Sequence, residues 1–525
     1  MIGLQVIVAV GIAVLVGTVA ARRLRVPSSI ILVALGLGLS LIAPLRTVGL
    51  PPELVLLIFL PALLFWESLT TSSREILRFL RGVVLSATVL VVVTAAAVAW
   101  VAHALGLPWE SAWIIGAAVA PTDATAVAAL GRVLPRGGMT ILRAESLIND
   151  GTALVVYALA LEFSLSHDPF SVGHASWLLV RSFAGGIVTG AAVGVAMFAV
   201  RRRLRDPVAG SLANVLTPFV AYLLAEELHS SGVLAVVICG LYMAHKAPGV
   251  IPAHTRQQTT GFWTLVTFLL NGALFVLIGL QFTTAVGGLS DAQVGRGILV
   301  TAAVFATVIL VRFGFLHLTI GLIRAVDRRP RQRLLRTTFR GRVVSTAAGL
   351  RGGVSLAVAL STPAALSIDG TRVRDMVVFV TAGVVVTSLV LQGLALPAII
   401  RWARLPPDTA FEGELDLAVT TLLDEAQAAL DDMAARLGVS DAVRDEVADD
   451  LEARRAAWDD ADVEDAEAPA HLRQRTALML DVVALQRAAL VRLRNERAID
   501  DTVLRRVQSK LDVEEVRLRG PAAVE

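Results

Sequence analysis

The sequence is dominated by long apolar runs, separated by short breaks that are charged or rich in Gly and Pro. A helix of about 20 apolar residues spans the hydrocarbon core of a bilayer and satisfies its own backbone polar groups there. Hydrophobic residues make up 55% of the chain and charged residues 17%, a composition that soluble domains do not have. We therefore predict an all-α polytopic membrane protein with about thirteen spans, at 3–21, 28–44, 53–71, 83–105, 110–131, 141–165, 176–200, 208–227, 231–246, 262–283, 296–323, 343–363 and 376–402.

The charges divide the chain into two parts with different solvents. Residues 1–406 contain 32 basic and 16 acidic residues, whereas residues 407–525 contain 15 basic and 28 acidic ones. The second part also has apolar residues at roughly helical spacing between its charges. We predict a transmembrane domain at 1–404 and a helical cytoplasmic domain at 405–525.

Arginines are concentrated in alternate loops between the predicted spans. Under the positive-inside rule these loops are cytoplasmic, which places the N-terminus outside and the C-terminal domain inside the cell. The intervening loops have few arginines, namely Arg46, Arg296, Arg372 and Arg374. The arginine-rich loops contain Arg22, Arg23 and Arg25; Arg74, Arg78 and Arg81; Arg132, Arg136 and Arg143; Arg201, Arg202, Arg203 and Arg205; and the run from Arg324 to Arg342.

The sixth predicted span carries two acids and an amide in the segment 145–150. An acid at the centre of a membrane helix costs about 2.5–3.5 kcal/mol, so each needs a proton, an ion or a counter-charge. Residues four apart share a helix face, which places Ser146 with Asp150 and Glu145 with Asn149 on neighbouring stripes about 100° apart. Ser146 and Asp150 can therefore face a cavity while Glu145 turns towards a cation on another helix.

Two earlier spans also contain polar residues. Glu67 lies inside the third apolar run, unless that run ends at Trp66 and leaves the carboxylate in water. In the fifth run Pro121 removes a backbone donor just before Thr122 and Asp123, which favours a kinked or unwound helix whose free ends could bind an ion. A plain kink with Asp123 capping the second half-helix is the simpler alternative, and both can hold.

The twelfth span offers a cation for Glu145. Arg351 is the sole arginine between 343 and 367, and glycines at 349, 352 and 353 allow close helix approach or an open backbone. We predict a buried Glu145–Arg351 ion pair with a mainly structural role. The fifth and twelfth spans occupy matching positions if spans one to six and eight to thirteen are repeats, a layout typical of inverted-repeat transporters.

Four segments, at 120–123, 145–151, 268–280 and 349–355, together resemble the NhaP/NHE-type monovalent cation:proton antiporters. They read Ala-Pro-Thr-Asp, Glu-Ser-Leu-Ile-Asn-Asp-Gly, Phe-Leu-Leu-Asn-Gly-Ala-Leu-Phe-Val-Leu-Ile-Gly-Leu and Gly-Leu-Arg-Gly-Gly-Val-Ser. The resemblance covers about 400 residues. It implies a thirteen-span fold, a homodimer, and a six-helix core with two crossed, unwound helices.

The resemblance also implies site roles. Asp150 would bind the ion and the proton, and Asn149 would complete the Asn-Asp pair of the electroneutral branch. The buried ion pair of the family matches Glu145 and Arg351. The remaining cation contacts are implied at Ser146, the backbone of Thr122 and Glu67, with Asp123 beside them.

The third span departs from the family at Glu67. Many members place the acid directly after the residue aligned with Phe65, but this chain has Trp66 there and the acid one residue later. In a regular helix the shift rotates the carboxylate by about 100°.

These features predict a secondary antiporter that exchanges Na⁺, or Li⁺ or K⁺, for H⁺ across the cell membrane, and not an enzyme. Carboxylate, hydroxyl and carbonyl oxygens suit hard monovalent cations. An inverted-repeat carrier of a small organic anion is the alternative, which Arg351 alone favours. No ATP motif, cofactor site or nucleic-acid site is indicated.

The C-terminal domain is predicted to consist of two amphipathic helical portions joined by an acidic, alanine-rich linker at 459–469. It could regulate transport or stabilise a dimer. It could equally be a solvated helical appendage without a separate activity.

Overall fold

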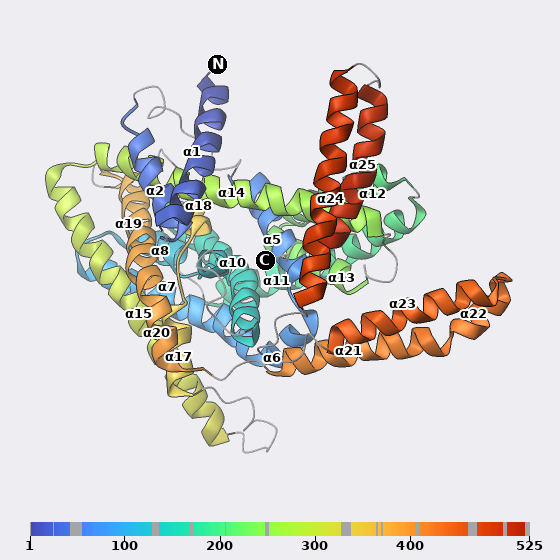
Figure 1. Ribbon diagram of the computed structural model, residues 1–525. Coiled ribbons are helices and arrows are strands. Elements are labelled where there is room, and N and C mark those ends of the chain that lie inside the picture. The colour runs from blue at the N-terminus through green and yellow to red at the C-terminus, as the bar shows by residue number, and fades with distance from the viewer. Residues whose placement is uncertain are drawn as a thin grey trace. The chain divides into compact units, whose positions relative to one another are not determined.

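The computed structural model describes an almost entirely helical chain (Figure 1). The described residues are 2–24, 26–42, 55–128, 136–166, 172–204, 206–246, 251, 253–326, 338–363, 366–368, 371–405, 409–459, 470–496 and 501–519. Several predicted features lie outside them, namely Arg25, Arg46, Arg132, Arg205, residues 327–337 of the arginine run and residues 460–469 of the linker.

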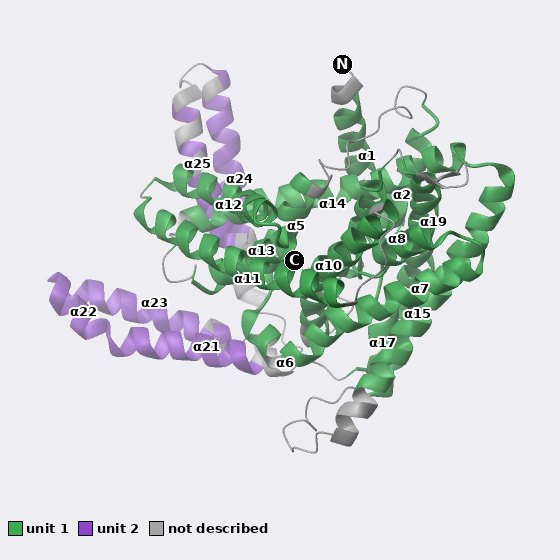
Figure 2. Ribbon diagram, turned by 180° about the vertical axis from the view of Figure 1, so that it is seen from behind, with its two compact units in different colours: residues 1–407 green, residues 408–525 purple. Residues whose placement is uncertain are grey.

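The chain divides into two compact units, Met1–Pro407 and Asp408–Glu525 (Figure 2). The first unit contains the apolar runs. Its helices are α1 Ile2–Leu24, α2 Ser28–Leu39, α5 Leu60–Thr70, α6 Ser73–Leu85, α7 Val91–Ala104, α8 Trp109–Val119, α9 Ala124–Ala128, α10 Arg136–Ser166, α11 Val172–Arg203, α12 Pro207–Glu227, α13 Gly232–Lys246, α14 Ala253–Gly287, α15 Asp291–Val326, α17 Phe339–Ala347, α18 Gly353–Leu360, α19 Val373–Thr387 and α20 Gly393–Ala403. In the described part of the chain, the π-helical turns η1 Val55–Phe59, η2 Ser86–Leu90 and η4 Ser388–Gln392 adjoin α5, α7 and α20.

A short β-hairpin, with two residues in each strand, interrupts the helical pattern. Strands β1 Ser367–Ile368 and β2 Thr371–Arg372 pair antiparallel, with Ser367 opposite Arg372 and Ile368 opposite Thr371. The hairpin directly precedes α19.

Within the described residues, eight helices are long and apolar enough to cross a membrane, and the chain is therefore a multi-pass membrane protein. Shorter apolar helices cover Ser28–Leu39, Leu57–Thr70 and Gly232–Lys246. The predicted total of thirteen spans stays a prediction. The eight helices cover Gln5–Leu24, Phe79–Ala104, Gly138–Leu165, Gly173–Arg203, Pro207–Glu227, Thr255–Gly287, Asp291–Thr319 and Val373–Ala403.

Prolines and short polar side chains set several helix starts. Pro27 and Pro108 occupy the N-cap positions of α2 and α8. Asp206 caps α12 by accepting from the backbone N–H groups of the next turn, and Thr338 caps α17 by accepting from Gly341 N at 3.1 Å. The helix limits therefore follow from local sequence signals.

Two apolar runs contain a broken helix, and the breaks cross each other. The fifth run divides into α8 and α9, which are separated at residues 120–123, and the twelfth divides into α17 and α18, which are separated at 348–352. Asp123 N donates to Leu350 O at 2.8 Å, so the two breaks are joined by a backbone hydrogen bond. Helix α10 packs against α8, α9 and α18 and thus runs beside the crossing.

Close backbone approach holds some of the helices together. A Cβ on Gly279 of α14 would lie 2.6 Å from Leu37 N and 2.8 Å from Gly36 C of α2. These are backbone atoms, which cannot rotate away as a side chain can. The α2–α14 contact therefore requires glycine at this position.

We predict that Gly279→Val lowers the Tm of the purified protein by several degrees, because overpacking costs about 1–3 kcal/mol or more. Gly261→Val on the same helix is the matched control, since nothing lies within 4 Å of its Cβ position. Thermal unfolding followed by fluorescence measures both. Equal Tm values for the two variants would contradict the α2–α14 packing.

The second unit contains α21 Thr409–Ala428, α22 Leu430–Leu437, α23 Asp441–Asp459, α24 Ala470–Asn495 and α25 Asp501–Arg519. Helices α21 to α23 form one helical hairpin and α24 with α25 forms another. The chain reverses after α22 at Gly438, whose φ of 66° is readily adopted by glycine.

Candidate functional site: the crossing of two broken helices

The break between α8 and α9 leaves backbone carbonyls that Arg351 satisfies. Its Nε donates to Val119 O at 3.0 Å and one terminal nitrogen donates to Ala120 O at 3.4 Å. The other terminal nitrogen donates to Gly349 O in the break between α17 and α18. The carbonyl end of a helix carries partial negative charge, so a guanidinium there stabilises both breaks.

The backbone of Arg351 is also held in place. Arg351 N donates to Ser388 Oγ at 3.1 Å, and the Ser388 hydroxyl donates to Gln392 Oε1 at 2.8 Å. Gln392 Nε2 in turn donates to Ala347 O at the end of α17, at 3.4 Å. Turn η4 is thus connected by hydrogen bonds to the break between α17 and α18.

Asp123 lies at the beginning of two half-helices. Its Oδ1 accepts from Thr125 N at 2.8 Å and from Ala126 N at 3.3 Å in α9. Its carboxylate also accepts a backbone hydrogen bond from Gly353, the first residue of α18, and a Cβ on Gly352 would overlap it. The predicted capping role is therefore present and extends to a second helix.

The predicted ion pair between Glu145 and Arg351 is wrong. Glu145 pairs with Arg312 of α15, whose two terminal nitrogens contact the two carboxylate oxygens, one of them at 3.3 Å. Arg312 Nε donates further to Ser345 O at 3.1 Å. Glu145 and Arg312 are 4% and 2% exposed. Arg351 was the wrong partner because the carbonyls of the breaks use its donors.

Sequence reasoning missed Arg312, although a signal was present. Arg312 lies near the middle of the apolar run 296–323, where an arginine requires a partner as much as an acid does. The glycines around Arg351 favoured that residue over Arg312 as the predicted partner. Gly349 and Gly352 lie in the unwound segment and Gly353 begins α18, and none of them brings Arg351 to Glu145.

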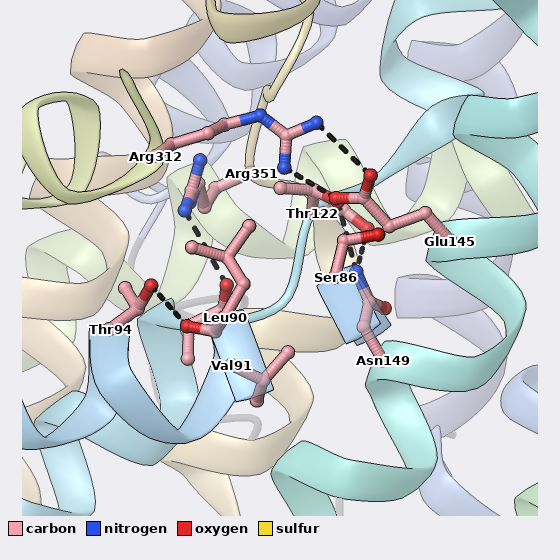
Figure 3. Close-up of a pocket in the computed structure, with 10 residues that line it drawn as sticks. Ser86, Leu90, Val91, Thr94, Thr122, Glu145, Asn149, Arg312 and Arg351 are labelled. Atoms are coloured by element: carbon pink, nitrogen blue, oxygen red, sulfur yellow. Dashed lines mark hydrogen bonds and ion pairs between the residues drawn. The ribbon is translucent and has the colours of Figure 1, made fainter. Parts of the chain in front are cut away.

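A small cavity lies among these groups, with space for about one water molecule. Figure 3 shows Arg312, Glu145, Asn149 and Arg351 among the side chains that surround it. Its lining residues are Ser86, Leu90, Val91, Thr94, Ala120, Thr122, Glu145, Asn149, Arg312 and Arg351.

The two neighbouring stripes of helix α10 have different surroundings. Glu145 and Asn149 line the cavity, whereas Ser146 and Asp150 do not. Asn149 Nδ2 donates to the Thr122 hydroxyl at 2.9 Å and to Thr122 O at 3.3 Å, and the Thr122 hydroxyl donates to Glu145 at 3.4 Å. This stripe of α10 therefore holds the break between α8 and α9 in place.

The other stripe carries Ser146 and Asp150, both about 95% buried. Ser146 Oγ accepts from Ala124 N, the first residue of α9, at 3.3 Å. Asp150 lies close enough to Asp123 and Glu67 to interact with both electrostatically. Within the described part of the chain, Asp150 forms no ion pair with an arginine or lysine.

Glu67 completes this group of acids. It lies on α5, and its Oε1 is buried without a hydrogen-bond partner among the described residues. The nearby charged groups are Asp123, Asp150 and Arg143. Burial of this oxygen disfavours the alternative in which the span ends at Trp66 and Glu67 is fully hydrated.

The described residues contain no cluster of three or more His, Cys, Asp or Glu side chains arranged to hold a metal ion. The acids near the crossing are instead interspersed with hydroxyl and carbonyl oxygens from Ser146 and Thr122. Such a donor set suits a weakly held monovalent cation, which would be a substrate of the protein and not a resident metal.

The site combines two crossed broken helices with a buried ion pair and, at Asp150, an acid without a basic partner among the described residues. This combination is typical of polytopic secondary transporters. Residues 10–402 match the family described as sodium/hydrogen exchanger, transmembrane. The chain therefore belongs to the sodium/hydrogen exchanger family.

Related proteins agree with this family. An uncharacterised Na⁺/H⁺ exchanger of Mycobacterium tuberculosis is 40% identical over 100% of this chain and 97% of its own length. The Na⁺/H⁺ antiporter ApNhaP of Aphanothece halophytica is 32% identical over 74% of this chain and 71% of its own. The sodium proton antiporter MjNhaP1 of Methanocaldococcus jannaschii has a similar fold, with a TM-score of 0.59, 19% identity, and coverage of 76% of this chain and 99% of that one.

We predict that Glu145→Gln and Arg312→Met each lower the stability of the protein by about 3–5 kcal/mol, because each strands a buried charge. The double variant should recover most of the loss. Arg351→Met should be destabilising too, but Glu145→Gln should not rescue it. Double-mutant cycles on thermal unfolding measure the coupling of Glu145 to each arginine. If Glu145→Gln rescued Arg351→Met and not Arg312→Met, the Glu145–Arg312 pair would be contradicted.

Proposed function

We propose that the protein exchanges Na⁺ for H⁺ across the cell membrane, with both ions competing for Asp150. The observation that carries this proposal is the difference between the two acids of α10. Glu145 is neutralised by Arg312, whereas Asp150 is buried without a basic partner among the described residues. A buried carboxylate in this state takes up either a proton or a cation.

The groups around Asp150 support cation binding. Ser146 lies one turn away on the same stripe, and Asp123 and Glu67 add negative potential. Thr122 O keeps a free lone pair beside its contact with Asn149, because a carbonyl accepts two hydrogen bonds. The proposed cation contacts are Asp150, Ser146, the backbone of Thr122 and Glu67, while Asn149 and Asp123 hold the break in place.

Competition at one carboxylate gives coupled exchange. A proton leaves Asp150 when Na⁺ binds, and Na⁺ leaves when a proton returns. If the site opens to one side of the membrane at a time, neither ion crosses without the other. Replacement of one unit charge by another makes the exchange electroneutral, provided that Asp150 alone changes its protonation.

The broken helices provide a basis for alternating access. Several carbonyls and N–H groups of the four half-helix ends are bound by a few side chains, so the crossing is held locally. We propose that α8 to α10 and α17 to α18 belong to a six-helix core that moves as inverted repeats against the rest of a homodimer.

An organic-anion carrier is a poorer fit to the site. Arg312 is occupied by Glu145, and Arg351 donates to three carbonyls. Other monovalent cations remain in scope, since a Bacillus pumilus relative described as a sodium, potassium, lithium and rubidium/H⁺ antiporter is 30% identical over 71% of this chain.

We predict that Asp150→Asn abolishes Na⁺-driven proton movement in proteoliposomes, because the amide neither releases a proton nor offers a charge to the cation. Glu162→Gln, on an exposed position of the same helix, is the matched control and should leave exchange unchanged. A pH-sensitive dye inside the vesicles reports exchange with Na⁺, Li⁺ and K⁺ in turn. Asp150→Asn protein that elutes like the wild type and still exchanges would refute Asp150 as the site.

We propose that the N-terminus is outside the cell and the C-terminal unit is cytoplasmic. This topology predicts that a cysteine at the exposed position Ser290, between α14 and α15, reacts with a membrane-impermeant maleimide in intact cells. A cysteine at the exposed Arg74 should react only after permeabilisation. The native Cys239 is buried and serves as the unlabelled background. The reverse labelling pattern would invert the topology.

A further inference from the structure

The two hairpins of the C-terminal unit bury very little by themselves. No described side chain of residues 409–459 is buried, and among the described side chains of residues 470–519 only Val483 and Leu490 are buried. Helices held together by so little apolar burial are marginal in water. Each hairpin therefore needs a further surface to pack against.

Polar contacts fix the helices within each hairpin. Trp458 Nε1 of α23 donates to Asp416 of α21 at 3.2 Å. Arg487 of α24 pairs with Asp512 and Glu515 of α25 at 2.7 and 2.6 Å. These partly exposed contacts orient the helices of each hairpin but contribute little free energy.

Each hairpin carries an exposed apolar stripe along one of its helices. Leu415 and Leu422 of α21 are two turns apart and 40% and 68% exposed. Leu478, Val482 and Leu485 of α24 follow i, i+4, i+7 spacing and are 65%, 39% and 71% exposed. The α24 stripe is separate from the face with Val483 and Leu490.

The charges of the two hairpins are complementary. Residues 409–459 contain 14 acidic and 4 basic residues, a net charge of −10. Residues 470–519 contain 7 acidic and 11 basic residues, a net charge of +4. Opposite net charges attract two surfaces and disfavour pairing of either hairpin with a copy of itself.

The chain between the hairpins is long enough for them to meet. The ten residues 460–469 reach about 33 Å when extended, whereas packed helices lie about 8–10 Å apart. Two segments joined by so short a linker experience an effective concentration in the millimolar range. Packing within one chain is thus favoured over packing between chains.

We propose that the acidic hairpin α21–α23 docks on the basic hairpin α24–α25 of the same chain, with α21 parallel to α24 and the Leu415–Leu422 stripe against the Leu478–Leu485 stripe. The product is a four-helix module whose core comes from both halves of the C-terminal unit. The proposal does not depend on the transported ion.

Paired cysteines in the full-length protein test this docking. In a Cys239→Ser background, which removes the single native cysteine, Leu422→Cys and Leu485→Cys are treated with a short bismaleimide. The matched control pairs Leu422→Cys with Ala484→Cys, since Ala484 is exposed but points about 100° away from Leu485. Gel mobility and peptide mass spectrometry identify the linked residues.

We expect the 422–485 link to form within single chains, in several-fold higher yield than the 422–484 link. Equal yields would show that the stripes do not face each other, and covalent dimers would show that the occupant is a second copy; either result overturns the proposal. If the substitutions at 422 and 485 reduce helix content, the pair Leu415→Cys and Leu478→Cys applies the same test two turns away.

Discussion

The transmembrane unit depends on satisfying polar backbone groups where two helices are broken inside an apolar core. Unsatisfied carbonyl and N–H groups at that depth cost several kcal/mol each, and no bulk water is available to them. Arg351 donates to carbonyls of both breaks, and Asp123 accepts from the N-terminal turns of α9 and α18. One cation and one anion therefore stabilise four half-helix ends, and the Asp123 N to Leu350 O hydrogen bond joins the two breaks.

This arrangement leaves α10 with two acids in different electrostatic situations. Glu145 is bound by Arg312 and linked through Thr122 and Asn149 to the first break. Asp150 has acids nearby and no basic partner within the described residues. An ion-paired acid and an acid without a basic partner among the described residues can thus be neighbours on one helix, because they lie on different stripes of it.

Much of the fold could be predicted from local signals. The apolar runs gave the membrane helices, Pro121 and the glycines around Arg351 marked the breaks, and the four-residue spacing separated Glu145 from Asp150. The partner of Glu145 could not be deduced in this way, because helix periodicity gives faces but not which distant helix lies opposite. An arginine has five donors and can serve carbonyls as well as a carboxylate, so two buried arginines left the pairing open. The position of Arg312 in an apolar run was the signal that would have made it a candidate.

Proton release on Na⁺ binding by the purified protein tests the division between Asp150 and Glu145 most directly. In weakly buffered detergent solution, addition of Na⁺ to the wild type should release a proton, and the Glu145→Gln/Arg312→Met double variant should still do so with its fold intact. Asp150→Asn should release none. Release by folded Asp150→Asn protein, or its loss in a folded double variant, would contradict the assignment of exchange to Asp150 and of a structural role to Glu145 and Arg312.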